Sequence, residues 1–171
     1  APNGRLLVQG GLNMLVRNRH LDILSVVQTM ENKGNIVLFM PDHYGMDGMS
    51  MSGGSKTYRS RVDKKAAAAG IRAVTMSRRV SYEAFCRYID ALDAVLLGNE
   101  KSCHPEFFLH LLARKKRIFM PADSLVRVQL NQYGAGSHAL EELAGQDAAH
   151  IRDFSPACLP EELAEIYQGG P

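Results

Sequence analysis

The sequence lacks the features of several protein classes. In its 171 residues no apolar run reaches the roughly 18–20 residues of a membrane span, and no secretory signal pattern stands at its start. The three cysteines form no C-x-x-C pair and the histidines show no metal-ligand spacing, so neither a zinc site nor a disulfide framework is expected. The sequence therefore predicts a cytoplasmic protein with reduced cysteines and with no membrane partner, cofactor or metal.

Basic residues are unevenly distributed, although the net charge is only +2. Residues 56–79 contain eight lysines and arginines and a single acid, Asp63. Such local basic density favours a polyanionic partner more than the net charge does. A second basic cluster, at residues 114–117, precedes a predicted strand and is interpreted as a solvated turn away from the strands' carboxyl ends.

Short apolar runs alternate with helical patterns along the chain. Strands are predicted over residues 36–40, 72–76, 94–97 and 117–120, with a weaker candidate at 5–9. None of these runs alternates in polarity, which is typical of strands buried on both faces. Helices are predicted over residues 20–33, 59–69, 81–92 and 105–115. The predicted fold class is therefore α/β, with three layers built around a largely parallel sheet.

The loop after the predicted strand 36–40 resembles a phosphate-binding loop that lacks its lysine. Such a loop reads G-x-x-x-x-G-K-[ST] directly after a buried strand. Over residues 43–50, Gly48 and Ser50 match this pattern, whereas His43 and Met49 replace the first glycine and the lysine. The loop looks like a nucleotide site without its charge.

Four predicted strand ends together resemble the first motor domain of superfamily 1 helicases of the RecD type. The loop 43–50 occupies the place of the phosphate-binding loop, and residues 76–80 that of the P-T-x-x-A motif, which contacts single-stranded DNA. Residues 97–102 stand where the family has L-L-D-E-[AS]-S, and residues 122–127 where it has G-D-x-x-Q-L. The order and spacing hold over residues 36–130, more than half of the chain.

The resemblance implies a P-loop-NTPase-like fold of the RecA/RecD-like kind. The helicase-like core is expected at residues 35–131, after a helical and strand lead-in at 1–34 and before a C-terminal helical extension of the same domain at 132–171. Ligands of such α/β folds bind outside the carboxyl ends of the strands, which is where the four motifs fall.

Departures from the helicase motifs indicate that the ATPase chemistry is lost. Met49 replaces the lysine that contacts the β- and γ-phosphates, and Asn99 replaces an aspartate that holds Mg²⁺. Val126 replaces the glutamine of the last motif, while Glu100 remains at the place of a water-activating glutamate. Without these groups most of the electrostatic stabilisation of phosphoryl transfer is missing, so ATP hydrolysis is not expected. The degenerate nucleotide site comprises Gly45, Gly48, Met49, Ser50, Asn99, Glu100 and Asp123.

Degenerate helicase units of this kind occur inside F-type conjugative relaxases, where a vestigial unit binds single-stranded DNA. The resemblance therefore implies a catalytically inactive, DNA-binding segment of a plasmid-encoded relaxase/helicase. Its partners would be single-stranded DNA and other domains of the same relaxase or proteins of the transfer machinery. The residues expected to contact DNA are Arg78, Arg79, Lys56, Tyr58, Arg59 and Arg61.

Two other functions stay open at the level of sequence. The first is an active NTPase or phosphometabolite enzyme that uses the loop at residues 53–56, in which Lys56 follows two glycines and a serine. The second is a protein-interaction domain that kept the fold and lost both ligands.

Overall fold

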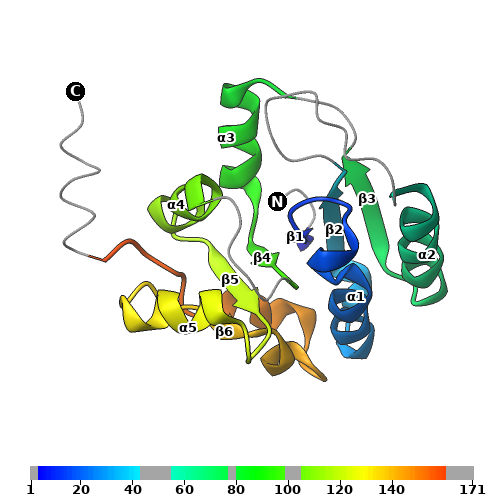
Figure 1. Cartoon of the computed structure of the whole chain (residues 1–171). Helices are drawn as coiled ribbons and strands as arrows, with labels where there is room; N and C mark the ends of the chain where they lie inside the picture. The colour runs from blue at the N-terminus through cyan, green and yellow to red at the C-terminus, as the bar shows by residue number, and fades with distance from the viewer. Residues whose placement is uncertain (1–3, 43–54, 77–79, 99–104, 161–171) are drawn as a thin grey trace.

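A computed structural model describes residues 4–42, 55–76, 80–98 and 105–160. Within these residues a six-stranded parallel sheet has helices on both faces (Figure 1). The strand order is β3-β2-β1-β4-β5-β6, and every neighbouring pair is parallel. The strands are β1 (Leu6–Gly10), β2 (Ile36–Pro41), β3 (Arg72–Met76), β4 (Ala94–Leu96), β5 (Arg117–Met120) and β6 (His138–Ala139).

Five α-helices and four short 3-10 helices accompany the strands in the described residues, and two of the 3-10 helices follow the last strand. The α-helices are α1 (His20–Thr29), α2 (Ser55–Ala68), α3 (Tyr82–Ala91), α4 (Pro105–Ala113) and α5 (Leu125–Gln132). The 3-10 helices are η2 (Val16–Asn18), η3 (Lys33–Asn35), η5 (Leu140–Leu143) and η6 (Ala148–Asp153). Helix α2 begins four residues earlier than its alanine-rich pattern predicted, so Lys56 lies in a helix.

Two hydrophobic clusters, one on each face of the sheet, give the molecule three layers. Alternate residues of β4 serve opposite faces, because Ala94 and Leu96 pack toward α1 and α2 whereas Val95 packs toward α3 and α4. In β5, Phe119 packs in the cluster on the side of α1 and α2, and Ile118 packs in the cluster on the side of α3 and α4. Double burial explains why the strand sequences do not alternate in polarity. The predicted three-layer α/β fold with a parallel sheet is confirmed.

The N-terminal segment supplies the central strand of the sheet. Residues 1–34 were expected as a lead-in, yet β1 pairs with β2 on one side and with β4 on the other. The order 3-2-1-4-5-6 is that of doubly wound dinucleotide-binding folds. The end of β1 therefore holds the central position, and the end of β2, which precedes the phosphate-loop pattern in the sequence, lies one strand away from it.

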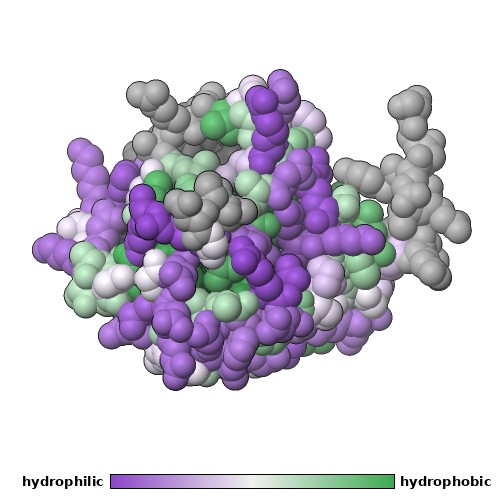
Figure 2. All heavy atoms as spheres, turned by 180° about the vertical axis from the view of Figure 1, so that it is seen from behind, coloured by the Kyte–Doolittle hydropathy of each residue, from purple (hydrophilic) through white to green (hydrophobic). Residues whose placement is uncertain are grey.

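The described part of the expected C-terminal extension is only partly helical. Residues 132–160 contain the edge strand β6 and the two 3-10 helices η5 and η6, and they pack on the sheet. In the described residues no helix is long and apolar enough to cross a membrane. Seen from behind the view of Figure 1, hydrophilic side chains cover most of the surface, with smaller apolar areas between them (Figure 2).

Candidate ligand site at the carboxyl edge of the sheet

The sheet has its topological switch point between β1 and β4. From β1 the chain continues to β2 on one side, and from β4 it continues to β5 on the other. In open α/β sheets ligands bind in the crevice that such a divergence leaves at the carboxyl ends of the strands. Gly10 and Gly11 end β1 at this crevice, and Gly98 follows β4 there. The backbone N–H of Gly11 donates to the carbonyl of Leu96 at 2.8 Å and joins the two strand ends.

Glycines allow very close backbone approaches at this crevice. A Cβ atom at Gly98 would lie 2.5 Å from the carbonyl oxygen of Asn18 and 2.9 Å from Cβ of Arg19. Gly11 has a φ of +74°, and a Cβ there would lie 2.4 Å from Nε2 of His20. Residues 11–19, the β1–α1 connection, are therefore packed directly against the end of β4.

A buried glutamine supports the connection from the face covered by α3. Gln9 is 1% exposed, and its Nε2 donates to the carbonyl of Gly11 at 2.8 Å. The hydroxyl of Tyr88 donates to Oε1 of Gln9 at 2.9 Å. Burial raises the pKa of Tyr88, so this hydroxyl keeps its proton at neutral pH.

A buried histidine supports the connection from the other face. His20 is the first residue of α1 and is 1% exposed. Its Nδ1 lies 3.4 Å from the hydroxyl of Tyr58, which comes from α2. Burial lowers the pKa of His20 to about 4, so the ring is neutral at pH 7. Among the described residues, Nε2 of His20 and Oδ1 of Asn18 are buried without a hydrogen-bond partner.

An aspartate closes the end of β2 beside the same connection. Asp42 Oδ2 accepts from Nη1 of Arg59 at 3.0 Å, and the Asp42 carbonyl accepts from the N–H of Met14 at 3.4 Å. Dinucleotide-binding folds often hold an acid near this place, where it binds a ribose hydroxyl. Here the carboxylate forms an ion pair that ties α2 to the end of β2.

Most of the residues of the degenerate nucleotide site fall outside the part of the chain that the structure describes. This holds for Gly45, Gly48, Met49, Ser50, Asn99 and Glu100, and also for the DNA-contact candidates Arg78 and Arg79. Asp123 is described, and it is exposed in the turn between β5 and α5. Val126 is 6% exposed and packs in the core between α5 and the sheet, which accounts for an apolar residue at that position.

The remaining DNA-contact candidates divide into buried, paired and exposed residues. Tyr58 is 6% exposed, so its ring packs in the core instead of presenting a face for base stacking. Arg59 pairs with Asp42. Lys56 and Arg61 are exposed on α2. The basic helix is therefore partly a structural element, and its exposed cations are those that a polyanion can reach.

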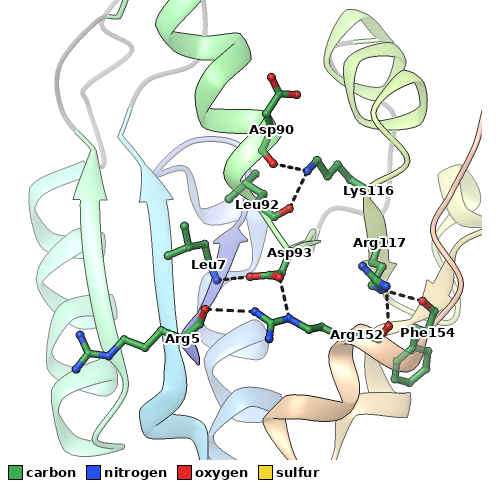
Figure 3. Close-up of polar contacts among 9 residues, drawn as sticks. All are labelled: Arg5, Leu7, Asp90, Leu92, Asp93, Lys116, Arg117, Arg152 and Phe154. Atoms are coloured by element: carbon green, nitrogen blue, oxygen red, sulfur yellow. Dashed lines mark hydrogen bonds and ion pairs between the residues drawn. The ribbon is translucent and has the colours of Figure 1, made fainter. Parts of the chain in front are cut away.

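Two residues of the second basic cluster join the start of β5 to the end of α3 and to the C-terminal segment, at the amino edge of the sheet (Figure 3). Lys116 Nζ donates to the carbonyls of Asp90 and Leu92, at 2.7 and 2.9 Å. Arg117 donates to the carbonyls of Phe154 and Arg152, at 2.8 and 2.6 Å. Residues 116 and 117, expected in a solvated turn, thus make internal contacts at the end of the sheet opposite the crevice.

Sequence reasoning missed Gln9, Gly11 and His20, whereas Gly98 falls within the motif at residues 97–102 that was expected at the ligand-binding edge. One signal was present, because Gly10 and Gly11 directly follow the weak strand candidate at residues 5–9. No group of three or more His, Cys, Asp or Glu side chains that could hold a metal ion occurs in the described ranges.

The strand order defines the class of a doubly wound α/β domain, and in this class ligands generally bind at the switch point. No model of a known protein family matches the sequence, and no curated protein matches it. Among the solved structures that are similar in fold are a glycosyltransferase and the N-terminal domain of a phosphatase. WaaG, a glycosyltransferase involved in lipopolysaccharide biosynthesis, shares 16% identity at a TM-score of 0.57, over 99% of this chain and 48% of WaaG.

The second structure is the N-terminal domain of Candida albicans trehalose-6-phosphate phosphatase. It shares 15% identity at a TM-score of 0.53, over 84% of this chain and 32% of the other. The chain thus spans about half of the first structure and a third of the second. At these identities the similarity concerns the fold alone.

Proposed function

We propose that this chain is a nucleotide-binding domain of a glycosyltransferase-like protein, with the ligand's phosphates at the switch point between β1 and β4. The observation that carries this proposal is the joint placement of Gly11 and Gly98 at the carboxyl ends of these two strands. At both glycines residues 18–20 occupy the space of a side chain, so the β1–α1 connection lies close against the strand ends, where a phosphate would meet its backbone.

The charges around the crevice favour an anionic ligand. Helix α1 begins directly behind the β1–α1 connection, and the amino end of a helix carries partial positive charge. Arg17 is exposed in that connection, and Arg19 stands at the N-cap position of α1, where it also pairs with Asp22. A negative phosphate is therefore favoured electrostatically at this edge of the sheet.

The glycine pattern favours a nucleoside diphosphate over a dinucleotide. The dinucleotide fingerprint G-x-G-x-x-G is absent after β1, where only Gly10 and Gly11 occur. WaaG, which is similar in fold, is a glycosyltransferase, and we propose a sugar linked to a nucleoside diphosphate as the ligand class of this chain. The chain matches 48% of WaaG, so an acceptor-binding region would lie in another part of such a protein.

Calorimetric titration of the protein with UDP, GDP, ADP and NAD tests this proposal. We expect saturable binding of a nucleoside diphosphate and a loss of affinity of about tenfold or more in Arg17→Ala, the size of a lost charge-assisted hydrogen bond. Arg87→Ala is the matched control, because Arg87 is an exposed arginine on α3. Absence of binding to every nucleoside diphosphate would refute the proposal.

The second candidate function is the binding of single-stranded DNA by an inactive helicase-like segment of a relaxase. The observation that favours it is the row of exposed cations on α2, which includes Lys56, Arg61 and Lys64. Fluorescence titration of labelled single-stranded DNA at two salt concentrations tests it, because contacts to phosphates weaken as salt rises. We expect weaker binding after alanine replacement of these three residues, or of Arg78 and Arg79 together. If both variants bind single-stranded DNA with the affinity of the wild-type protein, this candidate function is excluded.

A further inference from the structure

Helix α2 reaches the start of α1 through one tyrosine hydroxyl. The hydroxyl of Tyr58 accepts a hydrogen bond from the backbone N–H of His20 at 3.1 Å and lies 3.4 Å from Nδ1 of the same residue. The two rings meet edge to face, with centroids 5.8 Å apart. Since the ring of His20 is neutral, Nδ1 can accept the hydroxyl proton, and the ring then carries its own proton on Nε2.

The far side of the His20 ring meets the backbone of Gly11. The position of a Cβ atom at Gly11 is only 2.4 Å from Nε2, so the ring occupies the space that any side chain at residue 11 would need. Nε2 has no hydrogen-bond partner among the described residues, and the ring is 1% exposed. A ring enclosed in this way limits where Gly11 can move.

Polar contacts of Arg59 and Lys65 also hold helix α2 on the same side of the sheet. Arg59, the residue after Tyr58, pairs with Asp42 at the end of β2. Lys65 donates to the carbonyl of Leu21 in α1 at 2.8 Å. The position of the Tyr58 hydroxyl is therefore fixed relative to both β2 and α1.

We infer that Tyr58 and His20 are positioning residues for the proposed phosphate site. The Tyr58 hydroxyl fixes the ring of His20, and the ring holds Gly11 in the left-handed conformation that keeps the β1–α1 connection against the end of β4. This inference rests on the proposed nucleotide-binding function and adds the residues that keep the loop in its binding conformation. Neither residue touches the ligand in this arrangement.

Hydrogen exchange of the ligand-free protein tests the positioning role. Tyr58→Phe keeps the ring and removes only the hydroxyl, and Tyr133→Phe is the matched control on an exposed tyrosine. We expect amides of residues 10–14 to exchange about tenfold faster in Tyr58→Phe, a factor equivalent to about 1.4 kcal/mol. We also expect the ¹⁵N shifts of His20 to show a changed tautomer balance, which a purely packing role of Tyr58 would not produce. Unchanged exchange and an unchanged tautomer would overturn the inference.

A steric test uses Gly11→Ala alone and together with His20→Ala. If the ring confines residue 11, Gly11→Ala accelerates loop exchange more in the wild-type background than in the His20→Ala background, where space is available. Equal effects in both backgrounds would overturn the inference. Titration with a nucleoside diphosphate is the separate arm: no binding to the wild-type protein refutes the proposed function, whereas the exchange experiments still decide the positioning role.

Discussion

Replacement of Gly98 by alanine should destabilise the protein through a clash at the crevice. The new Cβ atom would lie 2.5 Å from the carbonyl oxygen of Asn18 and 3.2 Å from that of Arg19. Both are backbone atoms of the two residues that precede α1, so no side-chain rotation can relieve the contact. Overpacking of this kind costs about 1–3 kcal/mol of unfolding free energy. At about 2–4 °C per kcal/mol for a protein of this size, the Tm should fall by about 2–12 °C.

Thermal unfolding followed by circular dichroism measures this effect, with Gly34→Ala as the control. Gly34 lies in η3, and a Cβ atom there would meet no atom within 4 Å. The Tm of the control should therefore lie within about 2 °C of the wild-type value, since surface substitutions usually change the unfolding free energy by about 0.5 kcal/mol or less. Equal Tm values for the two variants would refute the close packing of the β1–α1 connection against β4.

Three further changes in stability follow from buried or capping groups. The folded-state pKa of His20, about 4, lies below its ordinary value of 6.5, so the unfolded chain binds more protons and the unfolding free energy should fall as the pH drops from 6.5 toward 4. Denaturant titrations should show that the unfolding free energy at pH 5 is about 2 kcal/mol lower than at neutral pH. This pH dependence should be absent in His20→Gln. Asp93→Asn should lower the unfolding free energy by about 1–3 kcal/mol in urea at neutral pH, because the carboxylate accepts hydrogen bonds from the N–H of Leu7 and from Nε of Arg152. An unchanged urea midpoint would contradict this role. Ser81→Ala should cost about 1 kcal/mol by the same measurement, because its side chain caps α3, and Ser81→Asn should retain most of the stability.

Sequence patterns predicted the layers of the fold because burial leaves a local signature. Strands buried on both faces give continuous apolar runs, as at residues 36–40 and 117–120. The central strand was only a weak candidate, because Gln9 and two glycines follow its short apolar stretch. Gln9 is nevertheless buried, since Tyr88 and the carbonyl of Gly11 satisfy its amide. Because Tyr88 lies 79 residues from Gln9 in the chain, no local sequence pattern indicates this contact.

The candidate site could be placed on the sheet edge, but its residues could not be chosen from sequence. Alternation of strands and helices predicts ligands at the carboxyl ends of strands. The order of the strands depends on long-range pairing, and this order makes the connection after β1 central. The contact between Tyr58 and His20 likewise joins residues 38 apart, so a histidine at a helix start gave no sign of its buried partner.

Titration of the wild-type protein with nucleoside diphosphates decides whether a phosphate site lies between β1 and β4. We expect saturable binding that Arg17→Ala weakens about tenfold or more and Arg87→Ala leaves unchanged. Absence of binding to UDP, GDP and ADP, or equal affinities in these two variants, would contradict a phosphate site between β1 and β4.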